Sequence, residues 1–410
     1  MFELVQNNPI LILINIIMLA IMWFTMRPAI IYTDEQVSSR QLYFVLFMWF
    51  VFNICSFWGS DWFHLYTAYD DIMKGDPIVE KIYTWIANKL APNNYFLFRI
   101  IVWGTAQLLL WDTFRRLSVS SHLLLALFVS IWMIWFSYGR VSLAMAIAFW
   151  GLTIYHKTSN ISIIPKIIGV CAILISFYLH KSAVFLIIVS LLTILTKRTS
   201  KTLFVIGLIG FPLLAYLLRE GLTDTIILTM TDRTEDLNEY LAKAQQYMNA
   251  EETGYGIGPL LAHILEKVPY YLIMAVGVKA IFDERKNTSN VNFLEVSEEI
   301  QNEYSGELEN YNDEAIKQNA PIPENVKVFI RALFFIVLFS SAFLFSNSVS
   351  TQVIYNRFLK FSFIPATVVL GFLLENPRYA NYAYNTYRLA LFGTCYQMIY
   401  MLYCSISNSK

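Results

Sequence analysis

The sequence has few charged residues and no net charge. Only 15% of its 410 residues are Asp, Glu, Lys or Arg, whereas 57% are hydrophobic, and a soluble globular chain has about 25% charged residues. The 30 basic residues are balanced by 30 acidic ones. Without a basic excess the chain cannot release phosphate counterions on a large scale, so we exclude nucleic acid as a partner. This composition predicts an all-α polytopic membrane protein with one integral domain over residues 1–410.

Cysteine is scarce as well, and no metal-binding pattern is present. The four cysteines have no CxxC spacing, so we interpret them as small residues packed in apolar runs. The adjacent acidic pair Asp70 and Asp71 is the pattern most similar to an acidic metal-binding motif, and we interpret it as a solvent-exposed pair in a loop. We therefore expect no metal and no cofactor. The first apolar run lacks a preceding basic stretch and a following small-residue cleavage site, which indicates a retained span rather than a signal peptide.

Long hydrophobic runs take up most of the chain. A transmembrane helix needs about 20 apolar residues, and the sequence predicts about twelve such helices, for which a GT-C-like arrangement is one candidate. The run at 163–195 could be one strongly tilted helix or two short spans that meet at His180, and we favour two because one span would be too long. The predicted spans are 8–26, 41–58, 95–111, 122–138, 141–155, 163–179, 182–195, 203–218, 258–281, 328–346, 354–374 and 388–404.

Lys and Arg in the short loops predict the orientation, because cytoplasmic loops carry an excess of both. Both termini and the loops after residues 58, 138, 180, 219 and 346 then lie on the outer face. The basic residues assigned to the cytoplasmic side are Arg27, Arg40, Arg115, Arg116, Lys157, Lys166, Lys197, Arg198, Lys201, Arg378 and Arg388.

Ionisable side chains recur at the outer ends of different predicted spans. Such groups are costly near hydrocarbon and usually face an aqueous cavity or a polar partner. For Lys181 and Lys360 the ordinary alternative is that the side chain reaches lipid headgroups, an alternative that Asp61 and His180 fit less well. The residues of this predicted outer cluster are Asp61, His64, Arg140, His180, Lys181, Arg357 and Lys360.

Three cationic residues of this cluster have the spacing of a phosphate site. Arg357 and Lys360 are three positions apart and share one helix face. Arg140 opens a predicted helix directly after Gly139, where free backbone N–H groups and the helix dipole reinforce its charge. We expect a diphosphate to fit between Arg140 and Arg357.

The motifs along the chain resemble those of one known family. The order is "SDW" followed by Tyr, then "GR" at the start of a helix, then "H-x-S-A" at the end of a helix, and a late "NR" before an apolar span. In this order the chain resembles the EpsG family over roughly residues 40 to 375. The acidic segment at 283–327 departs from the family pattern. The matching residues are Ser60, Asp61, Trp62, Tyr66, Gly139, Arg140, His180, Ser182, Ala183, Asn356 and Arg357.

The resemblance implies a Wzy-like polymerase for exopolysaccharide, capsule or O-antigen. Such a protein joins undecaprenyl-diphosphate-linked oligosaccharide units at the outer face of the bacterial cytoplasmic membrane, and a chain-length regulator and a flippase are candidate partners. Metal-independent glycosyl transfer needs cations at the leaving diphosphate, which we assign to Arg140, Arg357 and Lys360. It also needs a base for the sugar hydroxyl, for which His180 is our first candidate and Asp61 our second. We expect the sugars to contact Ser60, Trp62, His64, Tyr66, Tyr138 and Asn356.

Three segments between spans are hydrophilic. Residues 59–94 form an outer loop in this interpretation. Residues 220–257 have helical spacing of apolar positions and are interpreted as an amphipathic segment at the outer mouth, either a gate or an inert surface helix. Residues 283–327 are acidic and are expected to be a solvated cytoplasmic loop.

Two other classes of protein fit parts of this pattern. A flippase or transporter of the same glycolipid would also need cations in a cavity, although the two halves of the chain show no repeated charge pattern of the kind that many transporters have. A membrane acyltransferase could use a histidine base, but the two arginines would then lack a clear role.

Overall fold

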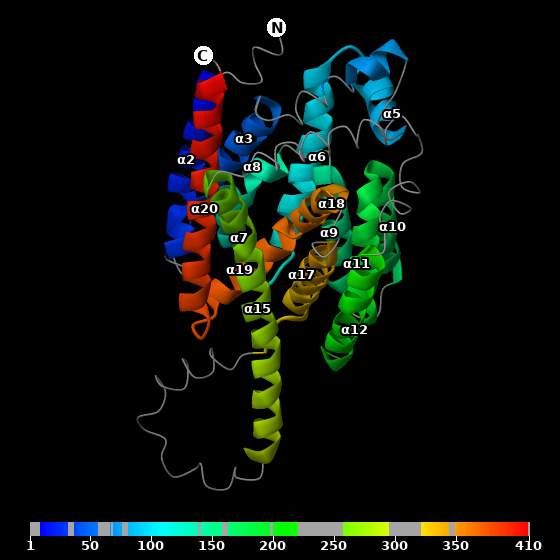
Figure 1. Ribbon diagram of the computed structural model, residues 1–410, viewed down its shortest axis with the longest axis vertical. Helices are drawn as coiled ribbons and strands as arrows, with labels where there is room; N and C mark the ends of the chain where they lie inside the picture. Colours follow the sequence, from blue (N-terminus) through cyan, green and yellow to red (C-terminus); the bar gives the residue numbers. More distant parts are fainter. Residues whose placement is uncertain are drawn as a thin grey trace.

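The chain folds into a bundle of helices that run roughly along one axis (Figure 1). A computed structural model describes residues 9–31, 37–55, 66, 69–75, 81–137, 141–157, 163–196, 200–219, 257–294, 321–343 and 349–408, and within these ranges it contains helices and no strand. This all-helical fold is compatible with an α-helical membrane protein. Two stretches, Ile12–Ile31 and Glu324–Ala342, are long and apolar enough to cross a membrane by length and composition.

The predicted apolar runs fall on helices, with one run, 354–374, divided between two helices. The first half of the chain contains α2 (Pro9–Ile31), α3 (Ser39–Cys55), α6 (Tyr95–Arg115), α7 (Ser121–Leu127), the π-helix η1 (Phe128–Trp132), α8 (Met133–Phe136), α9 (Val141–Lys157) and α10 (Ile163–Leu179). The second half contains α11 (Val184–Leu195), α12 (Ser200–Arg219), α15 (Ile257–Leu294), α17 (Glu324–Ala342), α18 (Val349–Lys360), α19 (Phe363–Glu375) and α20 (Ala380–Asn408). Helices α2 and α20 lie side by side (Figure 1), and Trp23 Nε1 donates to Tyr387 OH at 2.8 Å.

The long run at 163–195 breaks at His180, as predicted. Helix α10 ends at Leu179, a short 3₁₀ turn η2 (Lys181–Ala183) follows, and α11 begins at Val184.

The run at 354–374 was expected to be one span, and this expectation is wrong. Helix α18 ends at Lys360, a turn at Phe361 and Ser362 follows, and α19 begins at Phe363. Pro365 favours this break, because it has no N–H to donate to the carbonyl four residues earlier and is tolerated only in the first turn of a helix. Arg357 and Lys360 therefore lie in the last turn of α18.

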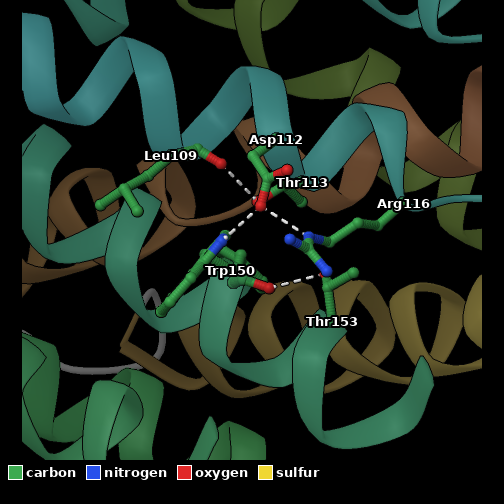
Figure 2. A network of polar contacts seen from close by, with 7 residues as sticks. Leu109, Asp112, Thr113, Arg116, Trp150 and Thr153 are labelled. Atoms are coloured by element: carbon green, nitrogen blue, oxygen red, sulfur yellow. Dashed lines mark hydrogen bonds and ion pairs between the residues drawn. The ribbon is translucent and has the colours of Figure 1, made fainter. Parts of the chain in front are cut away.

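Helices α6, α9 and α10 form a closely packed layer. A Cβ atom on Gly151 of α9 would lie 2.6 Å from the carbonyl oxygen of Gly169 of α10, so the two backbones approach too closely for any other residue. Figure 2 shows the tie between α6 and α9, in which Trp150 Nε1 donates to Asp112 Oδ2 at 2.8 Å and Arg116 Nε donates to the same oxygen at 2.5 Å. These contacts hold the second half of α9 against α6 and α10.

The segments between predicted spans are partly described. The predicted outer loop at 59–94 contains a helix, α5 (Lys81–Leu90), at the upper end in Figure 1. The hydroxyl group of Tyr69 donates to the carbonyl oxygen of Ala91 at 2.5 Å and so holds the end of α5. The amphipathic segment expected at 220–257 lies outside the described residues up to residue 256.

The flanks of the acidic segment are held together. Glu284 of α15 accepts from the backbone N–H of Ile322 at 3.0 Å and pairs with Lys327 at 2.9 Å. Asp283 accepts from Tyr379 OH at 2.8 Å and pairs with Arg378 at 3.2 Å. Residues 295–320, the middle of the acidic segment, lie outside the described residues.

Candidate functional site

The turn at His180 is built by its own side chain. The backbone N–H of Ser182 donates to His180 Nδ1 at 3.2 Å, and Ser182 Oγ lies 2.6 Å from the same nitrogen. The ring thus caps the free N–H groups at the start of the 3₁₀ turn, as Asn or Ser side chains do at a helix start. A backbone N–H can only donate, so Nδ1 accepts, and this hydrogen bond assigns the hydrogen of the neutral ring to Nε2. Nε2 is then a hydrogen-bond donor.

This turn is held against the end of α18 by phenylalanine rings. Phe185, just after the turn, stacks on Phe358 with ring centroids 4.3 Å apart and planes 4° apart. Phe343 and Phe361 lie 5.3 and 6.1 Å from Phe358, centroid to centroid. We call Phe185, Phe343, Phe358 and Phe361 the Phe358 cluster.

The Phe358 cluster brings His180 near the late motif. Phe358 directly follows Asn356 and Arg357 in the chain and lies two residues before Lys360. Arg357 is exposed, whereas Asn356, Lys360 and His180 are half-buried. The stack of Phe185 on Phe358 therefore links the two segments that carry these residues, and Arg357 is the most exposed of the four.

A second set of contacts joins the ends of α3 and α8. Asn53 Oδ1 accepts from Ser137 Oγ at 2.5 Å, and Asn53 Nδ2 donates to Gln107 Oε1 at 3.1 Å. Arg99 donates through Nε and Nη2 to the backbone carbonyl of Asn53, at 3.0 and 2.5 Å. We call Asn53, Arg99, Gln107 and Ser137 the Asn53 network.

The Asn53 network is buried, and Tyr66 packs against the same helix, α6, that carries Arg99 and Gln107. Asn53 and Ser137 are 0% exposed and Arg99 is 1% exposed, so each polar group must be satisfied inside the protein. Tyr66, the last residue of the "SDW…Y" motif, meets Tyr95 edge to face at 5.2 Å, and Tyr95 precedes Arg99 by one helical turn. In the sequence the "GR" motif begins two residues after Ser137.

Several predicted site residues are outside the described part of the chain. For these residues the assigned roles stay predictions. The described neighbour of Arg140 is Val141, the first residue of α9, and α9 contacts both the η2 turn and α17. The predicted residues concerned are Ser60, Asp61, Trp62, His64, Tyr138 and Arg140.

Sequence reasoning missed two ionisable groups near this end of α18. Lys267 Nζ of α15 lies 4.9 Å from the ring centroid of Tyr355, and Glu266 precedes it. Tyr355 OH lies 3.2 Å from Tyr271 OH. The sequence did contain a signal for them, namely a pair of ionisable residues inside an apolar run. Glu266 and Lys267 interrupt the run at 258–281 in the same way that His180 and Lys181 interrupt the run at 163–195. Arg99 in the run at 95–111 carried the same signal.

Within the described residues, no three His, Cys, Asp or Glu side chains come close enough to hold a metal ion. The chain matches no family model, no curated protein and no solved structure, so these comparisons assign it to no family.

Proposed function

We propose that this protein is a polysaccharide polymerase of a bacterial cytoplasmic membrane. It crosses the membrane about twelve times and joins undecaprenyl-diphosphate-linked oligosaccharide repeat units at the outer face. A flippase that supplies these units and a chain-length regulator are its expected partners. The proposal combines the resemblance to the EpsG family with the surroundings of His180.

The observation that carries the proposal is the stacking of Phe185 on Phe358 at 4.3 Å. It joins the His180 turn to the end of α18, on which two cationic side chains, Arg357 and Lys360, are three residues apart. A hydrogen-bonding ring and two cations in the same part of the bundle would suit a reaction in which a diphosphate leaves.

The reaction that we propose is a metal-independent glycosyl transfer. A hydroxyl oxygen of the acceptor sugar attacks the anomeric carbon of the growing chain, and the bond from that carbon to the diphosphate oxygen breaks. Undecaprenyl diphosphate leaves with the electron pair, and its charge is stabilised by Arg140, Arg357 and Lys360. The hydroxyl proton passes to a base.

The hydrogen bond at His180 Nδ1 helps to choose between His180 and Asp61 as the base that accepts the hydroxyl proton. With the hydrogen on Nε2, His180 is suited to donate a hydrogen bond to a sugar or diphosphate oxygen. We therefore assign the base to Asp61 and the donor to His180, which reverses the order that the sequence favours. His180 can act as the base only if the ring changes tautomer and gives up the Ser182 N–H.

The test is reconstitution of the purified full chain in proteoliposomes with lipid-linked repeat units. A polymerase lengthens the glycan chains, which gel electrophoresis of the extracted glycolipid resolves. A flippase moves single units across the bilayer without lengthening them, and an acyltransferase does neither unless an acyl donor is added. The double variant Arg357→Gln, Lys360→Gln is the matched control and should leave the units single.

A further inference from the structure

Lys267 is a half-buried lysine inside the apolar run at 258–281 of α15. Its Nζ lies 4.9 Å from the ring centroid of Tyr355, a side chain that is 2% exposed, so the ammonium group faces the interior of the bundle rather than lipid. Glu266, the preceding residue, turns toward α20 instead, where it accepts from Gln397 at 3.3 Å. Among the described residues, no Asp or Glu forms an ion pair with Lys267.

The ring of Tyr355 does not by itself compensate for the burial of this charge. A cation over a buried aromatic ring is attracted to it, but by less than the cost of taking an ammonium group out of water. An ionisable group inside a membrane helix usually pairs with another group or marks the path of a substrate. A ligand that supplies negative charge and acceptor oxygens would satisfy Lys267, because an ammonium group has three hydrogen-bond donors and no acceptor.

Tyr355 is itself held by a directed chain of hydroxyl groups. Ser341 Oγ donates to Val337 O at 2.6 Å and so uses its one hydrogen. It must then accept from Tyr271 OH, 2.5 Å away, and Tyr271 OH in turn accepts from Tyr355 OH at 3.2 Å. These hydrogen bonds fix the ring on which Lys267 lies against α15 and α17.

The face of α18 that carries Tyr355 also contacts the segment after the His180 turn. Tyr355 and Phe358 are three residues apart, so they share one helix face and are separated by about 4.5 Å along the helix. Lys267 contacts the first of these rings and Phe185 stacks on the second. Lys267 and the segment that follows His180 therefore contact adjacent turns of the helix that carries both cations of the late motif.

We propose that Lys267 binds a phosphate group of undecaprenyl diphosphate, as a further cation of the proposed diphosphate site. The inference rests on the proposed function for the identity of the lipid. An ammonium group would also donate to the phosphate of an ordinary anionic phospholipid, and the experiment separates the two lipids. Lys279 is the matched control, because it belongs to the same helix and lies 5.8 Å from the ring centroid of Tyr382, but is exposed.

The experiment is calorimetric titration of farnesyl diphosphate into the full chain in nanodiscs of neutral phosphatidylcholine, with empty nanodiscs as the blank. The variants are Lys267→Met, whose unbranched side chain can still pack on Tyr355, Lys267→Arg, which keeps the charge, and the control Lys279→Met. A second series adds phosphatidylglycerol to the nanodiscs. The elution volume and the unfolding temperature show whether each variant is folded, and Lys267→Gln replaces Lys267→Met if the latter does not fold.

We expect the Kd for farnesyl diphosphate to rise about tenfold or more in Lys267→Met, as for the loss of one charge-assisted hydrogen bond. The Kd should change little in Lys267→Arg and Lys279→Met, and phosphatidylglycerol should compete only weakly. The inference is overturned if the unaltered protein does not bind farnesyl diphosphate or if folded Lys267→Met binds it normally. It is also overturned if Lys267→Arg or Lys279→Met loses as much affinity, or if phosphatidylglycerol displaces the probe completely.

The outcomes for this inference and for the proposed function can be told apart. Binding of farnesyl diphosphate that depends on Lys267, without chain lengthening in proteoliposomes, refutes the polymerase and leaves the anion site. Chain lengthening by a protein whose binding of farnesyl diphosphate does not depend on Lys267 refutes the inference alone.

Discussion

At the residue scale, the two ring nitrogens of His180 have different roles: Nδ1 holds the turn, and Nε2 is proposed to act on the substrate. Nδ1 caps the turn through the N–H of Ser182 at 3.2 Å, and Nε2 carries the hydrogen of the ring. Asn can reproduce the cap but not Nε2. We predict that His180→Asn accumulates in the membrane at the normal level and loses chain extension, whereas His180→Ala also loses about 1 kcal/mol of stability with the cap. Polymer gels and membrane protein levels measure the two effects.

Lys181→Ala is the control, because Lys181 is exposed and should affect polymer length only mildly. Normal polymer from His180→Asn would show that the ring acts only as a cap. The chemistry would then depend on Asp61 with another donor.

Arginine at the proposed diphosphate site should not be replaceable by lysine. Arg140→Lys and Arg357→Lys keep the charge but lose the planar fork that binds two phosphate oxygens. We predict that polymer yield falls about tenfold or more, as expected for the loss of one charge-assisted hydrogen bond, while the protein still accumulates. Arg115→Lys, an exposed position at the predicted cytoplasmic end of α6, should have no effect. Unchanged yield from Arg140→Ala would remove that residue from the site.

At the scale of elements, the crossing of α9 and α10 depends on two glycines. A Cβ atom on Gly169 would lie 2.5 Å from the carbonyl oxygen of Gly151, and a backbone carbonyl cannot move aside as a side chain can. We predict that Gly169→Ala lowers the free energy of unfolding by about 1–3 kcal/mol, measured by thermal unfolding in detergent. Gly210→Ala is the control, because its nearest neighbour is a phenylalanine ring atom at 3.3 Å. Equal unfolding temperatures for the two variants would contradict the close approach.

The hydrogen bonds to Asp112 that join α6 and α9 should lose their contribution to stability only at acidic pH. Burial raises the pKa of Asp112, but the hydrogen bonds from Arg116 and Trp150 outweigh it and hold the pKa below its usual value. Because the pKa is lower in the folded state, the ionised carboxylate stabilises the fold at every pH above its unfolded-state pKa of about 3.9. This stabilisation is lost as the pH falls through the folded-state pKa. We predict that the difference in unfolding temperature between Asp112→Asn and the unaltered protein is constant from about pH 8 to 5 and shrinks below about pH 4. A difference that shrinks near neutral pH would point to another group.

At the scale of the whole molecule, the orientation can be tested with thiol chemistry. In a background without the four native cysteines, we predict that Lys181→Cys reacts in intact cells with a membrane-impermeant maleimide. Ser118→Cys should react only after the membrane is opened, because the positive-inside rule places that loop in the cytoplasm. Both positions are exposed, so access rather than burial decides the outcome. The opposite pattern would invert the orientation and move the proposed site to the cytoplasmic face.

The sequence by itself determined where most of the helices are and where the run at 163–195 breaks, but it showed neither the break at Phe361 and Ser362 nor helix α5. The helix positions and the break at His180 follow from local physics, because helical hydrogen bonds join residues four apart and the cap joins His180 to Ser182, two residues on. The sequence also marked ionisable groups in apolar runs. It did not show which of them meet, since Asn53 and Ser137 are 84 residues apart and Gln397 and Glu266 are 131 apart. Such pairs are decided by which helix faces pack together. Only the tertiary structure could therefore show the Phe358 cluster, the Asn53 network and the hydrogen bond between Gln397 and Glu266.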